Sequence, residues 1–215
     1  CQVTTNRSPS IVTASSTSEL LAECLTSALS QPSLEIEAIC VLDRPSSDAR
    51  EQVEAMASSD ARVVVLESEA PGESSARNTG LAAARGRYVA HLDSRDRWLN
   101  GSMTGVVGTA DAERADVVVF DATTFLGGAE PDLDADAASA SALASPVTRP
   151  GVTLLPEVRW SRHLREHAGT VLTRRDHLLS AGLTFSDGIS PDNGAYVLQL
   201  LAISDRVTRT RVSAY

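Results

Sequence analysis

The stretch Gly86-Arg-Tyr-Val-Ala-His-Leu-Asp93-Ser94-Arg95-Asp96-Arg97-Trp98 is the most informative part of this chain. After Gly86-Arg87 comes Tyr88–Leu92, a short and mostly apolar run that is typical of a buried central strand. That run leads directly into a cluster of two aspartates and two arginines. Ligands of open α/β sheets bind just outside the carboxyl ends of the strands, so a binding site is expected there. The alternative is a polar turn that only ends the strand.

Strand-like runs alternate with runs of helical periodicity along the chain. This alternation predicts an α/β fold with a mostly parallel sheet and helices on both faces. The expected strands are 11–13, 34–42, 62–66, 88–92, 116–121, 170–172 and 206–215. The expected helices are 20–31, 47–58, a short alanine-rich helix after a loop within 72–85, 102–114, 157–167, a short helix that is capped within 173–176 and stops at Gly182, and 190–203. We expect one domain, 1–215, in which 127–151 is a mobile surface loop, since it offers little to bury.

Composition excludes several functional classes. The net charge of −9 argues against nucleic acid as a partner, and no apolar run approaches the ~20 residues of a membrane span. The polar N-terminus predicts no signal peptide, and the start at Cys1 suggests a processed or excised piece. All 19 basic residues are arginine, which excludes a Walker A lysine and Schiff-base chemistry. The three cysteines lack Cys-x-x-Cys spacing, so we expect free thiols and no zinc site.

Four stretches, taken in order, resemble the family-2 glycosyltransferases, which have the Rossmann-like GT-A fold. They are 21–43, the segment Gly72-Glu-Ser-Ser-Ala-Arg77-Asn78-Thr-Gly80-Leu81, the segment 86–98, and 178–185 followed by Ser190-Pro-Asp192-Asn. The resemblance implies a single GT-A-like domain. Its nucleotide-binding half is about 9–100 and its acceptor-side half is about 101–215.

The resemblance also implies a set of site residues. Thr13, Asp43, Arg77 and Asp93 correspond to positions that hold the nucleotide-sugar in this family. A carboxylate at Asp43 can accept a hydrogen bond from the base or the ribose; the alternative is that it caps the following helix. The alternative for Arg77 is an exposed helical arginine. Asp192 corresponds to the general base, although an aspartate in a first helical turn is favourable without any catalysis.

The chain departs from the family pattern at the phosphate site. The acidic residue of the metal-binding motif is Arg95, and the residue before the expected base is Pro191. Arginine repels the divalent cation that carboxylates bind, so a Mn or Mg ion is doubtful, and Asp93 and Asp96 would be its ligands if one bound. We expect Arg95 to neutralise the diphosphate in its place.

Two functions are compatible with these observations. The first is an inverting glycosyltransferase of the hexosyltransferase class, which transfers a sugar from a UDP-type nucleotide-diphosphate sugar to a glycan or polymer acceptor without a metal. The second is a catalytically degenerate domain that binds a nucleotide or a partner within a larger cell-surface polymer synthase. Either way we expect a cytoplasmic protein, held at the inner face of the membrane only through a partner or a missing segment. The histidines predict no metal site: His91 fits a packed core, and His163 and His167 fit a surface.

Overall fold

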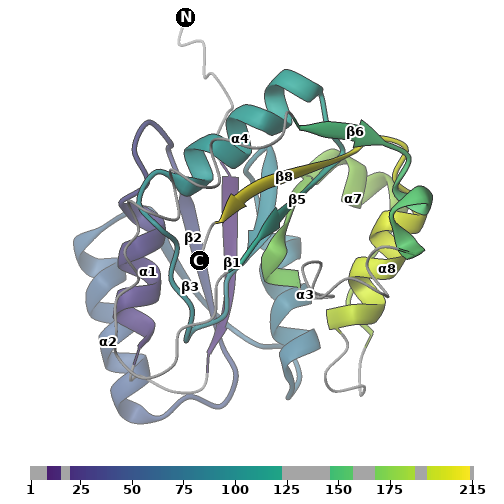
Figure 1. Cartoon of the computed structure of the whole chain (residues 1–215). Coiled ribbons are helices and arrows are strands. Elements are labelled where there is room, and N and C mark those ends of the chain that lie inside the picture. The colour runs from purple at the N-terminus through teal and green to yellow at the C-terminus, as the bar shows by residue number, and fades with distance from the viewer. Residues whose placement is uncertain (1–8, 16–19, 123–145, 157–167, 187–192, 214–215) are drawn as a thin grey trace, which may run out of the picture.

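The computed structural model describes residues 9–15, 20–122, 146–156, 168–186 and 193–213. These residues form one eight-stranded sheet in the order β3-β2-β1-β4-β7-β5-β8-β6 (Figure 1). The strands are β1 (Pro9–Ser15), β2 (Glu37–Leu42), β3 (Val63–Glu67), β4 (Tyr88–His91), β5 (Val117–Asp121), β6 (Val147–Arg149), β7 (Val171–Arg174) and β8 (Val207–Ser213).

The sheet has two halves that differ in strand direction. Strands β3, β2, β1 and β4 are parallel, so their carboxyl ends meet at one edge. β7 lies antiparallel between β4 and β5, β8 is parallel to β5, and β6 is antiparallel to β8. The α/β prediction of a mostly parallel sheet is therefore confirmed, and the first half supplies the uniform edge at which a site can form.

Helices cover both faces of this sheet, as the sequence predicts. They are α1 (Leu21–Leu29), α2 (Ser47–Ser59), α3 (Glu73–Ala83), α4 (Ser102–Glu113), α7 (Arg175–Ala181) and α8 (Asn193–Ile203), with 3-10 turns η1 (Gly151–Thr153) and η2 (Ala168–Thr170). α1, α2 and α4 pack on one face, and α3 and α8 pack on the other.

Alternate residues of the central strands pack against the helices on opposite faces of the sheet. In β2, Ala38, Cys40 and Leu42 face α1 and α2, whereas Ile39 and Val41 face α3. All four residues of β4 are buried, which confirms it as a central strand. Burial on both faces explains why these strands are mostly apolar and do not alternate regularly with polar residues.

Two predicted segments differ in the structure. The expected loop 127–151 ends earlier than predicted: β6 pairs with β8, and Gly151 is buried, where an added Cβ would lie 2.2 Å from the carbonyl oxygen of Leu201. Residues 127–145 of that loop lie outside the described residues. Pairing of β6 depends on β8, which lies far along the chain, so local composition did not indicate it. The segment 72–85 is helical from Glu73 onward, since Gly72, with a φ of 114°, turns the chain directly into α3.

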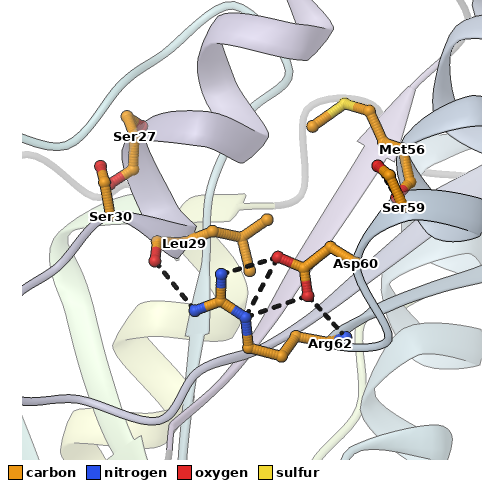
Figure 2. A network of polar contacts seen from close by, with 7 residues as sticks. All are labelled: Ser27, Leu29, Ser30, Met56, Ser59, Asp60 and Arg62. Carbon is orange, nitrogen blue, oxygen red and sulfur yellow. Dashed lines mark hydrogen bonds and ion pairs between the residues drawn. The ribbon is translucent and has the colours of Figure 1, made fainter.

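A polar network fastens the turn between α2 and β3 to α1. The Arg62 guanidinium pairs with Asp60 at 2.7 Å and donates to the carbonyl of Leu29 at 3.0 Å (Figure 2). The carbonyl at the end of α1 gains a donor that the helix itself cannot supply.

Within the described residues, no helix combines the length and apolar character that crossing a membrane requires.

Candidate functional site

Two aspartates lie at the edge where the parallel strands end, on either side of β1. Asp43 follows β2 and Asp93 follows β4 by two residues, and β1 lies between these strands with Thr13 near its end. The register places Thr13 beside Cys40 and Val12 beside His91, so the three chain segments reach the edge together. Neighbouring strands lie about 4.8 Å apart, so the backbones of Asp43 and Asp93 are roughly 10 Å apart across β1.

Asp43 is held at the start of α3. Its Oδ2 accepts the backbone N–H of Gly72 at 2.9 Å, and its Oδ1 is 3.3 Å from the Nε of Arg44. The helix after Asp43 is capped by Ser46, whose hydroxyl accepts the N–H of Ala49, so the capping alternative for Asp43 is wrong. The carboxylate keeps a side-chain exposure of 17%, and a ligand at the edge can therefore reach it.

Arg77 is buried in the second turn of α3, with only 5% of its surface exposed. Its guanidinium pairs with Glu73 one turn earlier and lies 5.3 Å from the centre of the Phe185 ring. The exposed-arginine alternative is therefore wrong. A buried guanidinium needs charge and hydrogen-bond partners, and Glu73 supplies one of them.

Asn78 makes a two-point contact that sequence reasoning missed. Its Nδ2 donates to the carbonyl of Phe185 and its Oδ1 accepts the N–H of the same residue, both at 2.8 Å. The Phe185 ring in turn stacks on Tyr196 of α8, with centroids 3.9 Å apart. The Ala-Arg-Asn segment is thus hydrogen-bonded, through Asn78, to the backbone of Phe185, which lies just before the segment 187–192 that carries Asp192.

His91 packs against the same aromatic pair. Its ring meets Phe185 edge-on at 4.9 Å and Tyr196 edge-on at 6.0 Å, and the residue is 3% exposed. The prediction of a packed core histidine is confirmed. Burial raises the pKa of Tyr196 well above its usual range, so this hydroxyl stays protonated.

The segment after β4 turns sharply and exposes one guanidinium. The Asp93 carbonyl accepts the N–H of Asp96 at 2.9 Å and the Cys24 thiol at 3.4 Å. Arg95 is exposed, and neither its guanidinium nor the Asp93 carboxylate is bonded to a described residue. Both groups therefore remain available to a ligand.

The residues present do not form a metal site within the described ranges. No three His, Cys, Asp or Glu side chains come together there in a way that could hold an ion. The segment between Asp93 and Asp96 carries Arg95, whose charge opposes a cation.

The structure describes some of the predicted residues incompletely or not at all. Asp192, Pro191, His163 and His167 lie outside the described residues, and Thr13 is placed by its backbone alone. Cys24 and Cys40 are free thiols, as predicted, and burial raises the pKa of the Cys40 thiol to about 12.

Solved structures with a similar fold include TarS of S. aureus and a mannosyltransferase of Pyrobaculum calidifontis. TarS of S. aureus, solved with UDP and with UDP-GlcNAc, matches 97% of this chain and 57–59% of its own solved length, at a TM-score of 0.76 and 20% identity. The mannosyltransferase PcManGT of Pyrobaculum calidifontis, solved with GDP-Man and Mn2+, matches 97% of this chain and 56% of its own length, at a TM-score of 0.68 and 15% identity. These likenesses establish the GT-A fold.

Sequence comparison identifies the family. The chain is 36% identical over 96 residues to the uncharacterized glycosyltransferase EpsJ of Bacillus subtilis, and 30% identical over 109 residues to the succinoglycan biosynthesis protein ExoO of Rhizobium meliloti. The matches span 45% and 51% of this chain but only 28% and 31% of those relatives. The model of glycosyl transferase family 2 matches residues 10–146, which is more than half of the chain. The chain therefore belongs to glycosyltransferase family 2.

Proposed function

We propose that this chain is an inverting glycosyltransferase that uses a UDP-type nucleotide-diphosphate sugar and an acceptor hydroxyl. The observation that carries the proposal is the pair of carboxylates, Asp43 and Asp93, on either side of β1 at the carboxyl edge of the parallel strands. Membership of the family and the likeness in fold to enzymes solved with UDP-GlcNAc and GDP-Man support it.

In this proposal the donor lies across the strand ends. Asp43 accepts a hydrogen bond from the base, Thr13 contributes to the same donor site from β1, and Asp93 accepts a hydrogen bond from the ribose. The α3 N-terminus, whose Gly72 N–H already binds Asp43, adds a partial positive charge near the donor. The 5% exposure of Arg77 favours an indirect role, in which it supports the aromatic pair behind the site.

Transfer would proceed by direct displacement at the anomeric carbon. The acceptor oxygen forms the new bond as the bond to the diphosphate breaks, and Asp192 takes the acceptor's proton. Negative charge grows on the departing diphosphate, and Arg95 can offset it through paired hydrogen bonds to phosphate oxygens. The positive charge of Arg95 supports transfer without a metal, because Arg95 lies between Asp93 and Asp96, the two carboxylates that would otherwise bind a cation.

We propose a glycan or polymer acceptor, and a relative named for succinoglycan biosynthesis supports this choice. A cytoplasmic location, with access to the membrane through a partner, is part of the same proposal.

A second candidate is a degenerate domain that binds a nucleotide or a partner without turnover inside a larger polymer synthase. Two observations favour it: Pro191 and Arg95 replace the usual acidic residues, and Arg77 already pairs with Glu73.

One experiment separates the two candidates. Calorimetry with UDP compares the wild type, Asp43→Ala and Asp192→Asn, and a hydrolysis assay with UDP-sugars measures turnover of the same three proteins. The enzyme proposal expects weaker UDP binding only in Asp43→Ala, and a loss of turnover of ~100-fold or more in Asp192→Asn. Binding without any turnover in the wild type favours the degenerate domain. Unchanged UDP affinity in Asp43→Ala would contradict the proposal that the nucleotide-sugar binds at this edge of the sheet.

A further inference from the structure

A polar cavity lies at the opposite edge of the sheet from the candidate site. It has a volume of about 410 Å³ and is lined by Arg87, Tyr88, Asp111, Arg114, Ala115 and Arg174. Arg87 precedes β4, whereas Asp93 follows it, so the two sites are about 20 Å apart along an extended chain. One small ligand cannot occupy both.

Two of the three guanidiniums in this cavity are held in place by carboxylates. Arg87 donates to Asp111 Oδ1 at 2.7 Å, and the Tyr88 hydroxyl donates to the same oxygen at 2.8 Å. Burial and this hydrogen bond raise the pKa of Tyr88 to about 12, so the hydroxyl keeps its proton and orients Asp111. Arg174 pairs with Asp116 at 2.6 Å, and Asp116 is itself buried. Each of these guanidiniums uses few of its five N–H groups, which leaves donors for a ligand.

The third guanidinium, that of Arg114, has no ion pair with a described residue. Arg114 also ends α4 in the left-handed region, with φ 50° and ψ 42°, where glycine is the favoured residue. A non-glycine residue held there costs free energy, and such positions cluster at functional sites.

The end of α4 does not repel an anion at this point. A helix C-terminus carries partial negative charge on its last carbonyls. Here the Arg206 guanidinium donates to the carbonyls of Glu113 and Arg114 and satisfies both. The local balance is three arginines lining the cavity against Asp111 and Asp116, in a chain whose net charge is −9.

We propose that this cavity binds a phosphate group, either as the free ion or as a phosphate ester. Arg87, Arg114 and Arg174 approach it from the start of β4, the end of α4 and the end of β7, so each can donate to a different oxygen of a tetrahedral anion. The proposal is independent of the donor site and of catalysis.

The test is calorimetry at low ionic strength, with inorganic phosphate and glycerol phosphate as separate titrants and saturating UDP present in a parallel series. Arg114→Gly is the informative variant, because it removes the guanidinium and places glycine at a left-handed backbone position, where we expect the fold to be kept. Arg44→Gly is the matched control: Arg44 is also exposed and also left-handed, with a φ of 48°, but it lies at the other edge beside Asp43.

We expect saturable phosphate binding that is weakened about tenfold or more in Arg114→Gly and unchanged in Arg44→Gly, with or without UDP. Stronger binding of one titrant identifies the free ion or the ester as the better ligand. Absence of saturable binding of either at millimolar concentration overturns the proposal. Equal weakening in both glycine variants, or displacement of the phosphate by UDP, also overturns it, since the ion then binds elsewhere.

Discussion

Arg77 shows what a motif conveys and what it omits. The Ala-Arg-Asn segment predicted an arginine at the nucleotide, and the four-residue spacing of Glu73 and Arg77 is visible in the sequence. Its burial depends on Phe185, which lies more than a hundred residues later in the chain. No local pattern indicates that contact. The neighbouring Asn78 is therefore the residue at which the structure changes the interpretation most.

We expect Asn78→Ala to destabilise the fold. The change leaves the N–H and carbonyl of Phe185 without their 2.8 Å partners, and losing such bonds costs about 1–3 kcal/mol. Urea unfolding measures the difference. Asn100→Ala is the control, since Asn100 is exposed, and its effect should stay within about 0.5 kcal/mol. An equal effect of the two changes would contradict a stabilising role for the hydrogen bonds between Asn78 and Phe185.

At the scale of elements, Gly108 and Gly151 differ in the space that surrounds them, so replacing each with alanine should have opposite effects on stability. A Cβ at Gly108 in α4 meets nothing within 4 Å, whereas a Cβ at Gly151 would lie 2.2 Å from the carbonyl oxygen of Leu201. Gly108→Ala should raise the free energy of unfolding by about 0.5–1 kcal/mol, because glycine inside a helix is unfavourable. Gly151→Ala should lower it by about 1–3 kcal/mol or more. Melting temperatures that move in the same direction would refute the close approach of η1 to α8.

The connection between α2 and β3 predicts a response to acid. The side-chain and backbone hydrogen bonds of Arg62 lower the pKa of Asp60 from 3.8 to about 2 (Figure 2). A depressed folded-state pKa adds stability that is complete above about pH 4 and is lost as the pH falls toward 2. The stability difference between the wild type and Asp60→Asn should therefore shrink across this range, as followed by urea unfolding. Arg62→Ala removes the hydrogen bonds that lower the pKa of Asp60, so the loss of stability between about pH 4 and pH 2 should be smaller in this variant than in the wild type. If the loss is equally large in Arg62→Ala, other groups cause it.

For the whole molecule, the sequence predicted the alternating strands and helices and the carboxyl-edge location of Asp43 and Asp93. The strand order in the second half was not predictable. β7 inserts between β4 and β5, and β8 lies between β5 and β6, because of pairings among segments far apart in the chain. The arginine cavity has the same origin, since Arg87, Arg114 and Arg174 come from three separate elements. Hydrophobic periodicity identifies an element but not its neighbours in the sheet.

The overall charge makes the final prediction sharp. With a net charge of −9, the protein repels an anionic donor, so local positive charge must overcome that field. Arg95 is exposed, is not bonded to a described residue and follows the Asp93 end of β4. A charge-assisted hydrogen bond contributes about 1.5–3 kcal/mol, so Arg95→Ala should weaken UDP binding about 10- to 100-fold. Uridine, which lacks the phosphates, should bind nearly as before.

Calorimetry of both ligands, in EDTA and then in manganese, measures this prediction, and Arg50→Ala serves as the control for loss of one positive charge. Arg50 pairs with Glu54 in α2 and with Glu67 at the end of β3, so its removal changes the net charge equally without removing a residue of the proposed donor site. If Arg95 supplies the positive charge that a cation would otherwise supply, wild-type UDP affinity is the same in EDTA and in manganese. Strict dependence on manganese, or equal affinities of Arg95→Ala and Arg50→Ala, would assign the diphosphate to other groups and leave Arg95 as a solvated turn residue.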